Sequence, residues 1–191
     1  LKEISKIERV DYAGTKPFIP YQATENLAPA YVSLESSEYQ VRLTASTHNK
    51  AGILQNKTPE ALENTIRLQK KMLTNLDHFL SFELDEQPES ENLLVSYGIS
   101  SRAAIEAAME LRKNGEKISV LTVKTLLPVS NKIYEIIKRF KHVFVIEENL
   151  TGQYRQILFG AASSAHISGI NKIGNMISPK EIMEEVLHDG K

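Results

Sequence analysis

The sequence predicts a three-layer α/β/α domain with a mostly parallel sheet over residues 92–191. Three apolar runs, at 93–97, 118–123 and 143–146, alternate with segments whose apolar residues recur at helical spacing. Strands that alternate with helices of this kind are typical of βαβ units, whose strands run parallel. The runs are apolar at consecutive positions, as expected for strands that helices cover on both faces.

The first strand is predicted at Leu93–Tyr97, and it ends at Gly98. Ser100 or Ser101 is expected to cap the helix that follows, because a hydroxyl oxygen can accept a hydrogen bond from a free backbone N–H. The helix ends at the Asn-Gly pair 114–115. Its inward positions are Ala104, Ile105, Ala108 and Leu111.

The chain then repeats the strand–helix pattern. A second strand is predicted at Ile118–Val123, and the Leu-Leu-Pro run at 126–128 turns the chain into a second helix near residues 133–140. The third strand covers Val143–Ile146, and a third helix follows near residues 154–161. Right-handed crossovers place the carboxyl ends of these strands along one edge of the sheet.

A fourth, weaker strand is expected at Ile167–Ile173. Ser178 and Glu181 then form a capping box, in which serine and glutamate satisfy each other's backbone N–H groups, with Pro179 at the first helical position. This pattern predicts a last helix that extends through Leu187.

The residues before 92 divide into two parts. Residues 1–57 carry prolines and tyrosines without periodicity, which predicts an extended arm that lies on another domain or subunit. Residues 58–91 are expected to form one helix with an apolar stripe, opened by Thr58 and Pro59 and ending near Leu80, followed by a solvated acidic linker at 83–91. The chain lacks an initial Met, and we interpret it as a fragment of a longer protein.

Composition excludes several classes of protein. Of 191 residues, 41% are hydrophobic and 25% charged, and the formal net charge is -1, so no overall field favours nucleic acid or a membrane surface. There is no cysteine, which excludes disulfides, thiolate zinc sites and cysteine-bound iron–sulfur clusters within the chain and favours a cytoplasmic location. No apolar run reaches the length of a membrane span.

Two turns at the predicted sheet edge carry candidate functional residues. The first turn combines Gly98 with Ser100 and Ser101, and its free N–H groups can hold an anion, although any tight turn between strand and helix needs the same residues. The second turn follows the third strand and favours a structural role over catalysis, because adjacent acids at a strand end point to opposite sides. Its candidate residues are Glu147, Asn149, Thr151, Gly152 and Gln153.

A third candidate lies in the polar loop 44–52, which contains His48 and Asn49. Taken by itself, this pattern predicts a surface loop. The five histidines show no spacing that suits a metal, and no Gly-x-Ser-x-Gly sequence is present. We therefore predict no catalytic and no metal-binding residue in this chain.

Taken together, these motifs resemble the α subunit of 2-oxoacid:ferredoxin oxidoreductases. The run Glu147-x-Asn149-x-Thr151-Gly152-Gln153 is the most specific, and Ser178-Pro179-x-Glu181 follows in the same order. The loop 44–52 is similar to the family's Thr-Gly-x-x-His-Asp-Glu-x-Gly loop, but Asn49 and Lys50 stand where the family has acids. Residues 92–187 resemble the transketolase C-terminal domain.

The resemblance implies a non-catalytic scaffold and interface domain of an enzyme that converts a 2-oxoacid to acyl-coenzyme A and reduces ferredoxin. Thiamine diphosphate, Mg²⁺ and an iron–sulfur cluster would be bound by other domains or subunits. Implied partners are a thiamine-binding β subunit, γ and δ subunits or ferredoxin, and coenzyme A and the 2-oxoacid within the complex. The domain before residue 1 would bind the thiamine pyrimidine.

Two alternatives stay open at this point. One is the C-terminal domain of another thiamine enzyme, either a transketolase or the β chain of a 2-oxoacid dehydrogenase. The other is a stand-alone α/β module that binds an anionic ligand or a partner at the edge formed by residues 98–101 and 147–153.

Overall fold

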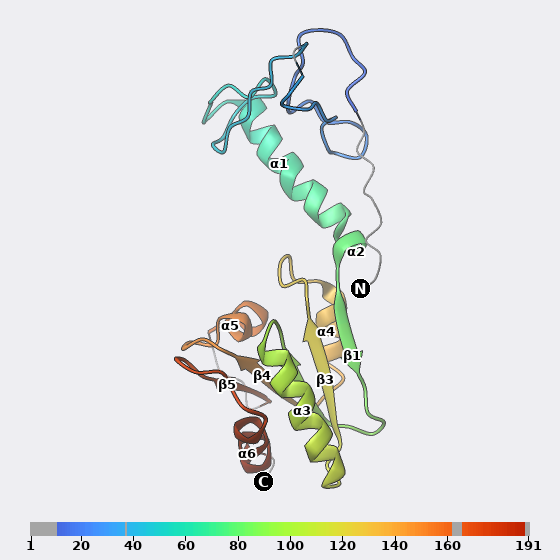
Figure 1. Ribbon diagram of the computed structural model, residues 1–191, viewed down its shortest axis with the longest axis vertical. Coiled ribbons are helices and arrows are strands. Elements are labelled where there is room, and N and C mark those ends of the chain that lie inside the picture. Colours follow the sequence, from blue (N-terminus) through green and yellow to red (C-terminus); the bar gives the residue numbers. More distant parts are fainter. Residues whose placement is uncertain (1–10, 37, 162–165, 190–191) are drawn as a thin grey trace. The chain divides into compact units, whose positions relative to one another are not determined.

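The computed structural model describes residues 11–36, 38–161 and 166–189. The chain divides into two compact units, Leu1–Asn75 and Leu76–Lys191. Figure 1 labels the helices and strands of the two units.

The second unit is built on a five-stranded sheet with the order β1-β3-β2-β4-β5. The four strands β2 to β5 are parallel, as predicted, and β1 pairs antiparallel with β3. The strands are β1 (Phe82–Asp85), β2 (Asn92–Ser96), β3 (Ile118–Val123), β4 (His142–Glu147) and β5 (Ile167–Asn171).

Helices cover both faces of this sheet, which confirms the predicted three layers (Figure 1). Helices α3 (Ser100–Lys113) and α6 (Pro179–Asp189) pack on one face around Leu94, Val120 and Ile146. Helices α4 (Asn131–Ile137) and α5 (Gln153–Phe159) pack on the other face. Consecutive strand residues enter opposite cores because side chains alternate along a strand.

Strand β1 corrects the prediction of a solvated linker. Its first residue, Phe82, directly precedes the expected linker, and Glu83–Asp85 lie inside the linker itself. Phe82 and Leu84 pack on the core while Glu83 faces outward, where it pairs with Lys124. Only two apolar positions mark this edge strand, and the acidic residues beside them conceal the period of two.

The start of α3 corrects a second prediction, because neither serine caps the helix. Ile99 occupies the N-cap position, and Ser100 and Ser101 are the first two helical residues. Their hydroxyls donate back to the carbonyls of Tyr97 and Gly98, at 2.7 and 2.6 Å. The serines therefore close the turn from within the helix.

The predicted capping box at α6 is confirmed. The Ser178 N–H donates to Glu181 Oε2 at 2.8 Å, and the Glu181 N–H donates to Ser178 Oγ at 3.3 Å. Lys172 adds an ion pair to the Glu181 carboxylate at 2.6 Å. Hydrogen bonds from Lys172 and Ser178 lower the pKa of Glu181 to about 2.

This shifted pKa predicts a pH-dependent stability. Because the folded-state pKa lies below the ordinary value of 4.5, the stabilisation is fully present above pH 4.5 and is lost as the pH falls toward 2. We expect Glu181→Gln to remove this part of the acid dependence. Urea unfolding of both proteins across this range measures it, with Glu184→Gln, at an exposed 3.7 Å ion pair with Lys180, as the control. Parallel pH profiles for the wild type and Glu181→Gln would contradict the prediction.

The first unit contains the arm and the long helix. Helix α1 (Pro59–Thr74) begins as predicted, with Thr58 Oγ1 accepting from the Ala61 N–H at 3.3 Å. The prediction of a single helix ending near Leu80 is wrong only near its end, because α1 ends at Thr74 and the short helix α2 (Leu76–Phe79) belongs to the other unit. The apolar stripe on α1 is exposed at Leu62, Ile66 and Leu73.

The described part of the arm is irregular, as expected, with isolated bridges and a cluster of Tyr12, Phe18 and Tyr39 rings. Among the described residues, no helix is both long and apolar enough to cross a bilayer.

Candidate functional site

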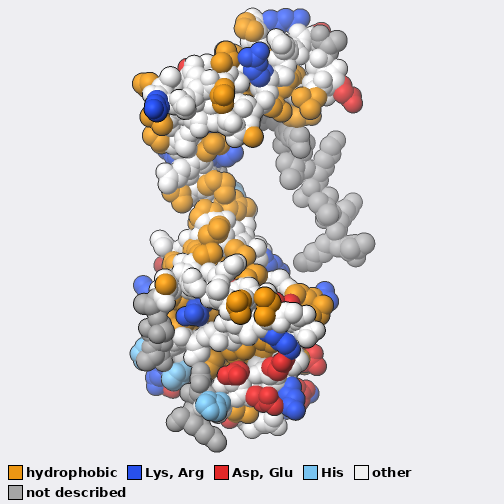
Figure 2. All heavy atoms as spheres, turned by 90° about the vertical axis from the view of Figure 1, so that its left-hand side faces the viewer, with side chains coloured by type: hydrophobic (Ala, Val, Ile, Leu, Met, Phe, Trp, Pro, Cys, Tyr) orange, Lys and Arg blue, Asp and Glu red, His pale blue; other side chains and the backbone are white. Residues whose placement is uncertain are grey.

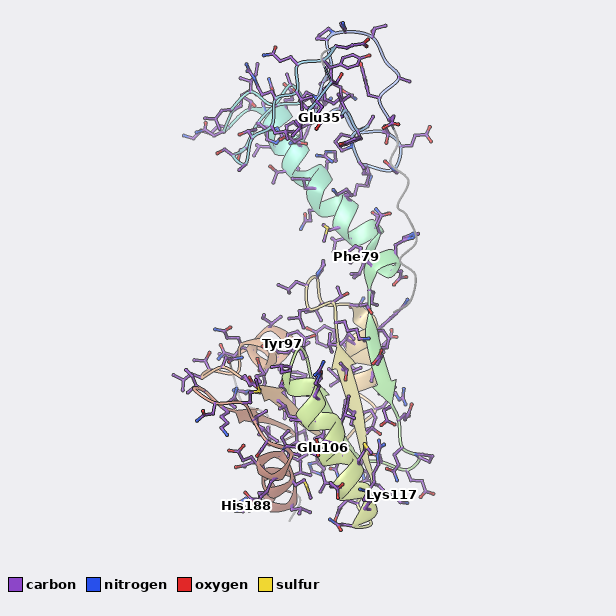
Figure 3. All side chains as sticks on the ribbon, in the orientation of Figure 1. Glu35, Phe79, Tyr97, Glu106, Lys117 and His188 are labelled. Carbon is purple, nitrogen blue, oxygen red and sulfur yellow. The ribbon has the colours of Figure 1, made fainter. Side chains whose placement is uncertain are left out.

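The candidate residues of the second unit meet at the carboxyl edge of the sheet. Ser96 of β2 pairs with Thr122 of β3 and with Ile146 of β4, so the loops after these three strands emerge together. Figure 3 places Tyr97, just after β2, at the opposite end of this unit from Lys117, just before β3. We use the name carboxyl edge for the segments 97–101, 124–130, 147–153 and 172–178.

Glu147 is the centre of this edge. Its side chain has no exposed surface. Oε2 accepts from the Tyr154 N–H at 2.7 Å and Oε1 from the Arg155 N–H at 2.9 Å, both in the first turn of α5. Oε2 also accepts from Asn149 Nδ2 at 2.8 Å and from the Tyr97 hydroxyl at 3.2 Å. The carboxylate is thus bound on all sides by groups of the same unit.

Asn149 completes the start of α5. Its Oδ1 accepts from the N–H groups of Gly152 and Gln153, at 2.8 and 3.1 Å. Gly152 has a φ of +67°, a conformation that glycine adopts without strain. Asn149 and Glu147 together satisfy every N–H from Gly152 to Arg155, the groups that a helix start leaves without internal partners.

This geometry assigns a structural role to the Glu-x-Asn-x-Thr-Gly-Gln run. A general base must reach a substrate proton, and Glu147 is buried with its oxygens already engaged. The N–H groups at the start of α5 are also occupied, so they cannot hold an anion. The structural role of this turn stays a prediction. Glu148 makes a separate contact, accepting from the Ile177 N–H at 3.3 Å.

Two tyrosines contact Glu147, Tyr97 through its hydroxyl and Tyr154 through its backbone N–H. Burial, followed by the neighbouring Glu147 charge, raises the pKa of Tyr97. Burial also raises the pKa of Tyr154 to about 12, with Tyr134 and Glu147 adding to the effect. The Tyr154 hydroxyl is buried without a hydrogen-bond partner in the described structure. Tyr97 ends an apolar run, so its polar end has no signal in the sequence pattern.

The unpaired hydroxyl yields a prediction. Tyr154→Phe removes a buried polar group that has no partner, so we expect the free energy of unfolding to stay equal or to rise by about 1 kcal/mol. Tyr97→Phe removes the bond to Glu147 and is expected to lower it by a similar amount. Urea unfolding of the two variants measures both effects, and a loss of stability in Tyr154→Phe would show that its hydroxyl has a partner.

The other predicted site residues at the carboxyl edge differ in their exposure to solvent. Gly98, Thr151 and Gln153 are exposed, while Ser100 and Ser101 are buried. A cleft of about 440 Å³ opens beside Tyr97, Gly98 and Ser101, and Lys124, directly after β3, also lines it. The Lys124 ammonium already pairs with Glu83, so the cleft offers no unpaired cation.

His48 and Asn49 belong to the first unit, whereas the residues of the carboxyl edge belong to the second. The prediction of a surface loop is wrong for His48, which is buried and stacks on Tyr21 with ring centroids 3.8 Å apart. Asn49 Oδ1 accepts from the N–H groups of Ala51 and Ile53, at 3.1 and 2.9 Å. The loop is therefore ordered by its own side chains.

The described residues do not fit a metal cofactor. No group of three His, Cys, Asp or Glu side chains among them is arranged to hold a metal ion. The sequence also has no cysteine for a cluster.

Comparison with known proteins finds a matching domain family and similar subunits. Residues 90–182 match the family described as pyruvate:ferredoxin oxidoreductase core domain II. The KorA subunit of 2-oxoglutarate synthase from Methanothermobacter marburgensis is 26% identical over 152 residues, covering 78% of this chain and 40% of the relative. The VorB subunit of ketoisovalerate oxidoreductase from the same organism is 27% identical over 128 residues, covering 66% and 36%.

A solved structure shares the fold of nearly the whole chain. It is the 2-oxoglutarate:ferredoxin oxidoreductase from Magnetococcus marinus with 2-oxoglutarate, coenzyme A and succinyl-CoA bound. The TM-score is 0.81 at 20% identity, over 98% of this chain and 33% of that one. The chain thus spans about 40% or less of the length of these relatives. Residues 90–182 thus match core domain II of pyruvate:ferredoxin oxidoreductase, and the chain is similar in sequence to subunits of 2-oxoglutarate synthase and ketoisovalerate oxidoreductase.

Proposed function

We propose that this chain is a scaffold and interface part of the α subunit of a thiamine-diphosphate-dependent 2-oxoacid:ferredoxin oxidoreductase. The complete enzyme would convert a 2-oxoacid and coenzyme A to acyl-coenzyme A and carbon dioxide while it reduces ferredoxin. The observation that carries the non-catalytic role is the burial of Glu147, the acid of the most specific motif. Its oxygens hold the start of α5 and a tyrosine, so it serves the fold and not a substrate.

The carboxyl edge supports an interface role. Large apolar side chains are exposed on four of its loops, and such clusters mark contact surfaces in soluble proteins. Figure 2 shows hydrophobic side chains exposed among charged ones on both units. The edge residues and their exposed fractions are Ile99 at 48%, Leu127 at 61%, Leu150 at 72%, Ile173 at 66% and Met176 at 70%.

The partners follow from this proposal. A thiamine-binding β subunit would cover the carboxyl edge, and γ or δ subunits or ferredoxin would complete the complex. Thiamine diphosphate, Mg²⁺ and the iron–sulfur cluster would be held by those other parts. Gly98, Thr151 and Gln153 are exposed at this edge and would contact the partner. A cytoplasmic location stays a prediction.

An assay of the chain with and without its partner tests the proposal. The purified chain receives thiamine diphosphate, Mg²⁺, a panel of 2-oxoacids, coenzyme A and an electron acceptor. We expect no turnover from the chain alone, and we expect the chain to co-purify with the thiamine-binding β subunit encoded in the same genome. Substantial activity of the chain alone would refute the scaffold role.

A companion experiment probes the carboxyl edge. Leu150→Ser is expected to weaken the complex with the β subunit without changing the stability of the free chain, because this side chain is largely exposed. Leu62→Ser, at an exposed position on α1, is the matched control. Equal complex stability in the wild type and Leu150→Ser would place the interface elsewhere.

A further inference from the structure

A small cavity between the arm and α1 has the composition of a binding site. It has a volume of about 270 Å³ and lies wholly within the first unit. Two cationic side chains, Lys50 and Arg67, line it together with a single acid, Glu63. The remaining lining residues are Tyr21, Gln22, Ala23 and Asn64.

Arg67 is held in one orientation by neutral acceptors. Its Nε and Nη2 donate to Asn64 Oδ1 at 3.0 and 2.8 Å, and Nη1 donates to the Leu27 carbonyl at 2.7 Å. Asn64 is itself buried against His48. Among the described residues, no carboxylate lies within ion-pair distance of Arg67. Its charge is therefore fixed in place and left without a counter-charge.

The unused donors of Arg67 indicate the chemistry of a ligand. A guanidinium carries five N–H groups, and these three contacts use one on each nitrogen. One N–H remains on Nη1 and one on Nη2. Two such donors match the two oxygens of a carboxylate, the pairing in which arginine forms its strongest hydrogen bonds.

The other charged groups at the cavity have separate roles. In the part of the chain that the structure describes, the Lys50 ammonium makes no ion pair, and its backbone N–H donates to Glu60 Oε1 at 3.1 Å. The Glu63 carboxylate likewise has no partner there, although Arg67 follows four residues later on the same helix. Lys50 would attract an anion in the cavity and Glu63 would repel it.

We propose that this cavity is a carboxylate-binding site, with Arg67 as the forked anchor and Lys50 as a second cation at the same cavity. The carboxylate can come from a small organic acid or from an acidic side chain of a docked protein. Both sources present the same group to Arg67. The proposal does not depend on the proposed function of the second unit.

Direct titration of the 191-residue chain tests the site. The probes are acetate, for a free acid, and N-acetyl-aspartate amide, for a protein side chain, and acetamide is the neutral control. Calorimetry or NMR should show saturable binding of at least one acid and none of acetamide, with an affinity that falls as salt is added. Tighter binding of the blocked aspartate would point to a protein partner, and tighter binding of acetate to a small ligand.

Variants of the three charged residues give opposite expected signs. Arg67→Gln should weaken binding by about tenfold or more, because it removes charge-assisted bonds. Lys50→Gln should weaken it by about threefold and Glu63→Gln should tighten it by about threefold. The Lys50 and Glu63 side chains form no hydrogen bond or ion pair in the described structure. The Lys50→Gln and Glu63→Gln variants should therefore keep the wild-type circular dichroism spectrum, even if Arg67→Gln disturbs the arm.

Three results would overturn the proposal. The first is the failure of both acids to bind the wild-type chain. The second is binding of acetamide as tight as that of acetate. The third is an equal affinity in the wild type, Lys50→Gln and Glu63→Gln, which would show that the charges at this cavity do not act on the ligand.

Discussion

Replacing Glu147 with alanine is expected to lower the free energy of unfolding by about 3 kcal/mol. The substitution leaves the N–H groups of Tyr154 and Arg155 and the Tyr97 hydroxyl without their acceptor. The Tyr154 N–H is buried, so water cannot replace the carboxylate there without opening the structure. Urea unfolding of the chain, followed by circular dichroism, measures the change.

Glu148→Ala is the matched control for this prediction. Its carboxylate accepts one backbone hydrogen bond at 3.3 Å and is partly exposed, so we expect a loss below about 1 kcal/mol. If the two alanine variants were equally stable, Glu147 would not be the anchor of α5. The comparison separates the burial of one acid from the general effect of removing negative charge next to it.

Asn149→Asp is expected to lower the free energy of unfolding by about 2 kcal/mol at neutral pH. The new side chain keeps an oxygen for the N–H groups of Gly152 and Gln153. However, it replaces the amide nitrogen, 2.8 Å from Glu147 Oε2, with a second carboxylate oxygen. Two carboxylates at this distance repel each other when both are ionised. In the wild type, this position holds the Asn149 amide group, which donates a hydrogen bond to Glu147.

The pH dependence of this variant has a defined sign. Repulsion would raise the folded-state pKa of one of the two acids, so the penalty is present at high pH and is relieved as the pH falls. Asn149→Ala also loses hydrogen bonds but adds no charge, so its defect should not depend on pH. Urea unfolding of both variants at neutral and mildly acidic pH measures this, and an Asn149→Asp defect that persists in acid would contradict the explanation.

Local patterns predicted most of the second unit. The four parallel strands and the helices between them appear where apolar runs and helical spacing place them, and the capping box of α6 is present. These features depend on residues within a few positions of one another, which a sequence displays directly.

Edge and end features were predicted less well. β1 is short and pairs on one side only, so the acidic residues on its open face outweigh its two apolar positions. At α3, the serines were expected to cap the helix but lie inside its first turn. The difference is one residue in register, and the sequence contains two adjacent serines that suit either position.

The sequence by itself determined that the second unit is a parallel α/β domain whose loops meet at one edge, because apolar periodicity and caps are local properties. Only the tertiary structure decided what those loops do. The Tyr97 hydroxyl reaches Glu147 across 50 residues of sequence. Arg67 likewise reaches Leu27 across 40 residues. Contacts of this kind depend on how strands, arm and helix pack together, and no spacing pattern encodes them.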